Sequence, residues 1–207
     1  MLDTPAANGP MDLASVTKDV RILLGICGSI SVIGVPHLLL WMREQFGILQ
    51  VQVVMTRMAD WIMDRRTVER VVGCRVAVDW SDCEPGPAHI KLSQWADVIV
   101  VMPASANFLG KLANGLADDL LSSIALAATR PLIVAPVMNP AMWSKGVVQR
   151  NLARIREDGH EVIMPAAGLS LASGNEEAGS LGDGRQILIR AITAGVQCAA
   201  NRRGVNP

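Results

Sequence analysis

The sequence has few aromatic residues and no net charge. Only five Trp and two Phe occur among its 207 residues, so a hydrophobic core must be built from Leu, Val, Ile, Met and Ala. The 19 basic residues balance the 19 acidic ones, and no run of Lys or Arg is interleaved with aromatics. This pattern argues against nucleic acid or an anionic membrane surface as the main partner, and it leaves small molecules or peptides.

Metal-binding and membrane-spanning patterns are also absent from the sequence. Its four cysteines, Cys27, Cys74, Cys83 and Cys198, form no C-x-x-C pair, and its three histidines are scattered. Neither a zinc site nor a disulfide framework is therefore expected. No apolar stretch reaches the ~20 residues that span a bilayer, and no secretory signal is evident. We therefore expect a reducing, cytoplasmic location and no membrane partner.

The length and the 50% hydrophobic content suit one domain with a sizeable core. Residues 1–18 are rich in Ala, Pro, Gly and Asp without periodicity, so we expect a flexible N-terminal tail. The domain is expected to cover residues 19–200, and residues 201–207 to form a C-terminal tail. Residues 165–185 show no periodicity, and a structureless segment of this length typically forms a lid or a binding loop.

Residues 97–107, DVIVVMPASAN, predict the central strand of the fold. The apolar run has no alternation and stops at a Pro followed by small and hydroxyl-bearing residues, which is typical of a buried parallel strand and the loop after it. Residues 131–135 end in a similar way, at the sequence PVMNPAMW. Because ligands of open α/β sheets bind at the carboxyl ends of the strands, the two turns predict one shared crevice.

Further strands are expected at residues 20–27, 50–55 and 161–164, with a possible short one at 75–79. Helical patterns lie between them, including residues 35–46, 58–72 and 88–96. The alternation predicts a single-domain α/β fold, a doubly wound, flavodoxin- or Rossmann-like parallel sheet with helices on both faces.

Two more strands also end in polar turns. Residues 20–27 run into Gly28, Ser29, Ile30 and Ser31, where a glycine permits close approach and the hydroxyls can donate to an anion, and residues 50–55 end at Thr56. A plain strand-to-helix turn is an equal alternative for the first, since it is not G-x-G-x-x-G.

His89 lies in the first turn of the helix expected at residues 88–96. The positive end of the helix dipole there favours a neutral imidazole that can act as a base. A capping or core role is the alternative.

Four stretches together resemble the homo-oligomeric flavin-containing cysteine decarboxylases. They are GSIS at 28–31, the helix start at His89 and Ile90, PASAN at 103–107, and PVMNPAMW at 136–143, which is similar to that family's P-x-M-N-x-x-M-W signature. The resemblance implies FMN as cofactor, a homo-oligomer such as a trimer or a dodecamer built from trimers, and flavin near the subunit contacts. The residues it assigns to FMN are Gly28, Ser29, Ile30, Ser31, Thr56, Pro103, Ser105, Ala106, Asn107, Phe108, Val137 and Met138.

The same resemblance assigns catalysis to His89 and Asn139, with Asn139 gripping the substrate carboxylate. It places Met142, Trp143, Ala172, Ser173 and Gly174 beside the substrate. Phe108 departs from the motif, which more often has Thr, so a hydrogen bond to the cofactor can be missing. Cys27, near this site, is interpreted as a small buried hydrophobe.

Two branches of the family differ in their product. Phosphopantothenoylcysteine decarboxylases of coenzyme A biosynthesis carry Ala-Cys-Gly in the lid, where this sequence has Ala172-Ser173-Gly174. The other branch oxidatively decarboxylates the C-terminal cysteine of a ribosomally synthesised precursor peptide and releases an enethiol for aminovinyl-cysteine formation, as in lantibiotic maturation. The sequence resembles this second branch more closely. The alternatives are the coenzyme A enzyme, a flavin prenyltransferase, or a non-catalytic flavin-binding regulatory subunit.

Overall fold

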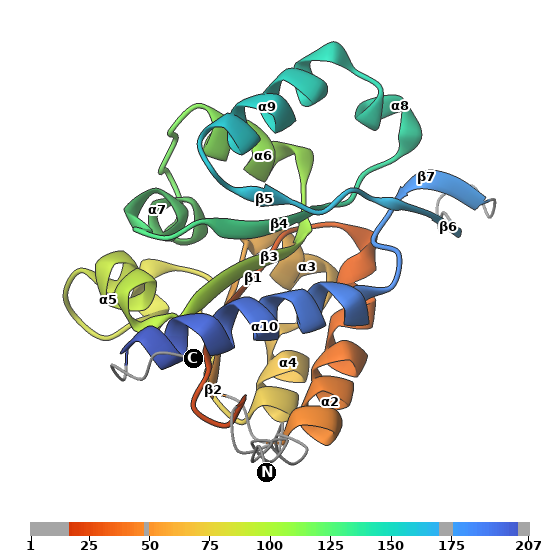
Figure 1. Ribbon diagram of the computed structural model, residues 1–207. Helices are drawn as coiled ribbons and strands as arrows, with labels where there is room; N and C mark the ends of the chain where they lie inside the picture. The colour runs from red at the N-terminus through yellow and green to blue at the C-terminus, as the bar shows by residue number, and fades with distance from the viewer. Residues whose placement is uncertain (1–16, 48–49, 170–175, 203–207) are drawn as a thin grey trace, which may run out of the picture.

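The computed structural model describes residues 17–47, 50–169 and 176–202 (Figure 1). Five parallel strands form the central sheet, in the order β2-β1-β3-β4-β5. They are β1 (Arg21–Ile26), β2 (Gln50–Met55), β3 (Val98–Ala104), β4 (Leu132–Pro136) and β5 (Glu161–Val162). This order is the doubly wound, flavodoxin-like arrangement, which confirms the predicted fold class. All seven residues of β3 are buried, as the unbroken apolar run predicted.

Helices cover both faces of the sheet because successive strand side chains point to opposite sides. Ile22, Leu24 and Ile26 of β1 belong to one core, and Leu23 belongs to the other. The first core is completed by α2 (Val35–Phe46), α3 (Arg57–Ile62), α4 (Arg65–Val72) and α10 (Gly184–Arg202). The second is completed by α5 (Ala88–Trp95), α6 (Ala106–Ala113), α7 (Leu120–Ala127) and α9 (Gly146–Glu157). Figure 1 shows the two layers on either side of the strands.

Short helical elements lie between the strands and the longer helices. The 3-10 helix η1 (Ile30–Gly34) follows β1, the 3-10 helix η2 (Trp80–Asp82) precedes α5, and the short helix α8 (Pro140–Trp143) follows β4. Within the described ranges, no helix has the combination of length and apolarity needed to cross a membrane.

Two expected elements differ from the structure in the region before α5. Residues 58–72 form two helices, α3 and α4, because Met63 is extended and Asp64 begins a new helix by accepting a hydrogen bond from the Arg66 N–H at 2.9 Å. The strand expected at residues 75–79 is wrong, since only Ala77 pairs with β2, as an isolated bridge to Val54. The Asp82 carboxylate accepts hydrogen bonds from the N–H groups of Val78 and Asp79, the two residues after Ala77. The backbone there therefore turns away from the sheet.

The expected lid also has secondary structure. Residues 165–185 were expected to be structureless, whereas β6 (Ala166–Leu169) and β7 (Glu176–Ser180) pair as an antiparallel hairpin. The hairpin rests on backbone pairing between segments rich in Ala, Gly and Glu. Such residues have low strand propensity and gave no alternating signal. In Figure 1 the hairpin lies beside α8, at the end of the sheet where β4 finishes.

Candidate functional site

A cavity of about 710 Å³ lies at the carboxyl ends of the parallel strands. Part of its lining comes from the segments that follow three neighbouring strands: Gly28 after β1, Thr56 after β2, and residues 105–108 after β3. The strand order reverses between β1 and β3, and ligands of doubly wound sheets bind at such a switch point. The volume falls within the range of small-molecule and cofactor sites.

The structure brings seven of the predicted site residues to this cavity and leaves others outside its lining. The seven that line it are Gly28, Thr56, Ser105, Ala106, Asn107, Phe108 and Met142. The predicted residues outside the lining are Ser29, Ile30, Ser31, His89, Pro103, Val137, Met138, Asn139 and Trp143. Ala172, Ser173 and Gly174 lie outside the described residues.

The polar residues at the strand ends also begin the helices that follow. Thr56 Oγ1 accepts from the Ala59 N–H at 3.3 Å, and Ser105 Oγ accepts from the Phe108 N–H at 3.3 Å. Both are N-cap positions, where hydroxyl-bearing residues are favoured because the first N–H groups of a helix have no intrahelical partner. The same side chains that fix the local backbone therefore line the cavity.

Gly28 is required by a close approach of two chain segments at the cavity wall. A Cβ atom at this position would lie 2.2 Å from Cγ and 2.6 Å from Cβ of Met58. The backbone carbonyl carbon of Met58 would be 3.1 Å away. Only glycine allows α3 to begin this close to the end of β1. Gly28 thereby permits the approach that places Thr56 and Arg57 in the cavity lining.

Charged residues that the sequence analysis did not select also line the cavity. Arg57 forms an ion pair with Asp79, and this contact, together with a backbone hydrogen bond from Trp80, holds the pKa of Asp79 below its usual range. The pairing joins the start of α3 to the segment before η2, which are 22 residues apart in the sequence. No local pattern signals such a contact.

Lys111 and two aspartates form a second charged group in the lining. Lys111 Nζ lies 2.7 Å from Oδ1 of Asp118 and 2.6 Å from Oδ2 of Asp119. Burial alone would lower the pKa of Lys111, but the hydrogen bonds to both carboxylates outweigh it and raise the pKa. Asp119 is also the N-cap of α7, accepting from the Ser122 N–H at 2.7 Å, as expected for an acid at a helix start.

His89 lies behind one wall of the cavity. It is the second residue of α5, and its ring meets the Trp80 indole edge-on, with the ring centroids 5.3 Å apart and the planes at 80°. Trp80 itself lines the cavity. His89 Nδ1 is buried and makes no hydrogen bond to the described part of the chain. A capping role is not seen, because Pro87 is the N-cap and no side chain caps this helix.

Asn139 begins the short helix α8, where its Oδ1 accepts from the Met142 N–H at 2.8 Å. The amide NH₂ group remains available to donate, since the cap uses the oxygen alone. Met142 brings this helix to the cavity.

Cys27 is fully buried at the end of β1 and packs in the second core. Burial raises the pKa of its thiol to about 12, against a smaller opposing effect of hydrogen bonds from Ser105. The thiol is therefore protonated near neutral pH, which agrees with its interpretation as a buried apolar residue. Among the described residues, no group of three or more His, Cys, Asp or Glu side chains is arranged to hold a metal ion.

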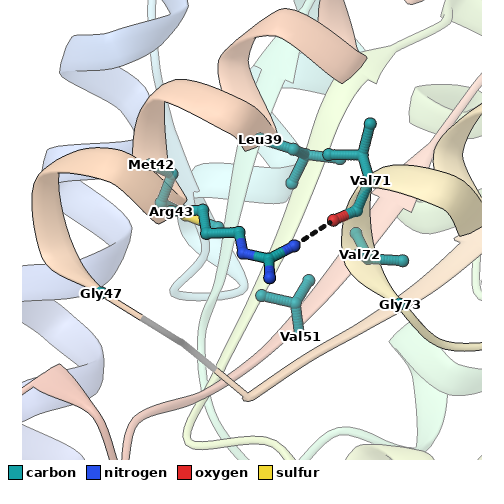
Figure 2. Close-up of a pocket in the computed structure, with 8 residues that line it drawn as sticks. All are labelled: Leu39, Met42, Arg43, Gly47, Val51, Val71, Val72 and Gly73. Atoms are coloured by element: carbon teal, nitrogen blue, oxygen red, sulfur yellow. Dashed lines mark hydrogen bonds between the residues drawn. The ribbon is translucent and has the colours of Figure 1, made fainter.

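A second pocket lies at the amino end of β2, the end of that strand opposite to the first cavity (Figure 2). It is lined by the end of α2, the start of β2 and the end of α4, and its volume is about 110 Å³. Arg43 reaches across it and donates to the carbonyl of Val71 at 3.3 Å. The lining is otherwise apolar or glycine, so this pocket lacks the size and the polar groups of the first cavity.

Comparison with known proteins finds similar sequences. Mersacidin decarboxylase from a Bacillus species (strain HIL-Y85/54728) is 38% identical over 151 residues, which is 73% of this chain and 76% of that protein. The coenzyme A biosynthesis bifunctional protein CoaBC of Haemophilus influenzae is 34% identical over 167 residues. That match covers 80% of this chain but only 40% of CoaBC, so the chain spans about two fifths of that relative.

A solved structure, that of the FMN-dependent cysteine decarboxylase SpaF, superposes with a TM-score of 0.79 at 44% sequence identity. The match covers 89% of this chain and 99% of SpaF. The sequence matches the Flavoprotein family over residues 13–194. The chain therefore belongs to the Flavoprotein family.

Proposed function

We propose that this chain is an FMN-dependent peptidyl-cysteine decarboxylase. Its reaction is the oxidative decarboxylation of the C-terminal cysteine of a ribosomally synthesised precursor peptide, which gives an enethiol for aminovinyl-cysteine formation. The observation that carries the proposal is the cavity of about 710 Å³ at the switch point of the sheet. Its lining includes residues from three of the stretches that resemble the cysteine decarboxylases. SpaF, whose structure is similar to that of this chain, is described as an FMN-dependent cysteine decarboxylase.

The residues of the cavity fit FMN. Thr56, Ser105 and Asn107 supply hydroxyl and amide groups for hydrogen bonding, and Arg57 supplies a cation for the phosphate. Phe108 is 2% exposed and adds an apolar wall. Gly28 leaves no side chain where α3 approaches β1. FMN, when bound, supplies the two-electron acceptor that oxidation of the cysteine requires.

His89 is proposed as the base that removes the thiol proton of the substrate cysteine. Its ring contacts Trp80 at the cavity wall, and its buried Nδ1 lacks a partner within the described residues. Burying a polar nitrogen without a hydrogen bond is unfavourable, so an unpaired imidazole at this position suits a group that acts on a substrate. The overall reaction proposed removes carbon dioxide and two hydrogens from the peptide, and His89 would take the thiol proton.

Asn139 is proposed to orient the substrate carboxylate. Its oxygen is held by the backbone of α8, which fixes the direction of the NH₂ group. A neutral amide binds the carboxylate without the strong ion pair that an arginine would form. It therefore stabilises the ground-state carboxylate less and does not oppose its loss as carbon dioxide. Met142 and Trp143 are proposed to contact the peptide, with the β6–β7 hairpin as the lid.

The competing substrate is phosphopantothenoylcysteine, because CoaBC is also similar to this chain. We would incubate the purified protein separately with a peptide ending in Cys and with phosphopantothenoylcysteine, and measure product masses. The proposal expects a loss of about 46 mass units from the peptide, the sum of carbon dioxide and two hydrogens. Turnover of phosphopantothenoylcysteine alone, with a loss of about 44 mass units, would assign the chain to coenzyme A biosynthesis instead.

The protein is further proposed to be a cytoplasmic homo-oligomer, a trimer or a dodecamer built from trimers, with the flavin near subunit contacts. Two exposed apolar side chains support an oligomer. Met58 at the cavity is 57% exposed, and Trp61 on the same helix is 82% exposed. A subunit contact would remove this apolar surface from water. Sedimentation of the wild type and of Trp61→Glu tests the proposal, since a wild-type monomer would exclude it.

A further inference from the structure

The charges of the cavity are unbalanced for a ligand that carries a phosphate. Two cations, Arg57 and Lys111, and three carboxylates, Asp79, Asp118 and Asp119, line it. The lining therefore carries one net negative charge when all five groups are ionised. A phosphate dianion entering this cavity needs a cation that can leave its present partner.

The two cations differ in how firmly they are held. Lys111 is paired with two carboxylates at 2.6 and 2.7 Å, and its side chain is only 15% exposed. Arg57 is paired with Asp79, its side chain is 83% exposed, and it forms no second ion pair among the described residues. An exposed ion pair contributes little to stability, so Arg57 can exchange Asp79 for another anion at low cost.

We infer that Arg57 is a cofactor-selecting residue: it leaves Asp79 to bind the phosphate of FMN, so that Asp79 competes with the phosphate for the guanidinium. This inference rests on the proposed function. The guanidinium presents paired N–H donors that match phosphate oxygens. Arg57 directly follows Thr56 in the sequence, and both residues line the cavity. Asp79 then holds Arg57 at the cavity until the cofactor arrives.

The inference predicts opposite effects for the two members of the pair. Arg57→Gln removes the cation and should weaken FMN binding about tenfold, the size expected for one hydrogen bond to a charged group. Asp79→Asn removes the competitor and one negative charge, so it should tighten FMN binding. The asparagine oxygen can still accept the hydrogen bond that Asp79 receives from the Trp80 N–H at 2.7 Å. Riboflavin, which lacks the phosphate, should bind all three proteins equally.

The test uses the full chain freed of flavin and titrated with FMN and with riboflavin, following the quenching of flavin fluorescence. Arg66→Gln is the matched control. Arg66 of α4 forms an ion pair with Asp64, the N-cap of that helix, and its side chain is 80% exposed and does not line the cavity. It should leave both affinities unchanged. Melting curves of each variant check that the fold is retained.

Selective loss of FMN affinity in Arg57→Gln, together with a gain in Asp79→Asn, supports the inference. Equal weakening of FMN and riboflavin in Arg57→Gln would overturn it, because the side chain would then only shape the wall. Weaker FMN binding by Asp79→Asn would overturn it as well. Failure of the wild type to bind either flavin would instead refute the proposed function, so the two failures are distinguishable.

Discussion

Replacing Gly28 by Ala tests how closely the cavity depends on the contact between β1 and α3. The new Cβ would lie 2.2 Å from Cγ of Met58, and rotation of that exposed side chain can relieve this contact. It cannot relieve the contacts with Cβ at 2.6 Å and with the carbonyl carbon at 3.1 Å, because these atoms move only with the backbone. The start of α3 must therefore shift, and Thr56 and Arg57 shift with it.

Overpacking of this kind costs about 1–3 kcal/mol in the free energy of unfolding. For a chain of this size, that corresponds to a fall of about 2–12 °C in the melting temperature. FMN retention should fall as well, because two residues of the cavity wall move. Thermal melts and the ratio of flavin to protein absorbance after purification measure the two effects.

Gly34→Ala provides the matched control. This glycine has a φ of −84°, and an added Cβ would meet no atom within 4 Å. Alanine should fit without strain and leave both the melting temperature and the flavin content close to those of the wild type, or raise stability by up to about 1 kcal/mol. A Gly28→Ala protein with wild-type stability and full flavin content would show that the cavity does not depend on the close contact between β1 and α3.

Three other predictions concern individual side chains. His89→Asn should retain bound flavin and its melting temperature but lose turnover of a Cys-terminal peptide, and full activity would refute its assignment as the base. Asn139→Asp keeps an oxygen for the Met142 N–H but loses the amide donors, so it should fold normally and lose turnover; Asn139→Ala should also lose about 1 kcal/mol as the cap disappears. His160 accepts a hydrogen bond from the Leu132 N–H at 3.1 Å, and burial lowers its pKa below the ordinary value of 6.5. The folded state then binds fewer protons than the unfolded state, so this contribution to stability is present above about pH 6.5 and is lost as the pH falls toward the folded pKa. Urea melts from pH 8 to pH 5 should show this loss in the wild type and a flatter profile in His160→Gln, and identical profiles would contradict it.

The sequence carried a strong signal for the sheet and for the position of the cavity. A buried parallel strand needs apolar residues on both faces, so β3 is visible in the sequence as an unbroken run of apolar residues. Its carboxyl end must then be followed by Ser105 and the first turn of α6, whose residues line the cavity. The topological rule that places ligands at such ends needs no knowledge of side-chain contacts.

The charged lining could not be predicted in the same way. Arg57 and Asp79 are 22 residues apart and meet only because α3 and the segment before η2 converge at one sheet edge. Trp80 acquires its role from contact with His89, which lies on a different element. The hairpin of β6 and β7 was missed for a related reason, since its pairing comes from backbone groups of residues with weak strand propensity.

Under the proposed function, the residues that line the cavity would hold FMN, which would accept two electrons from the C-terminal cysteine before its carboxyl group leaves. The most direct measurement mixes the anaerobic, flavin-loaded protein with one equivalent of a peptide ending in Cys and records the visible flavin absorbance. We expect this absorbance to be bleached in step with the appearance of the decarboxylated peptide. Decarboxylation with the oxidised flavin spectrum unchanged would contradict it.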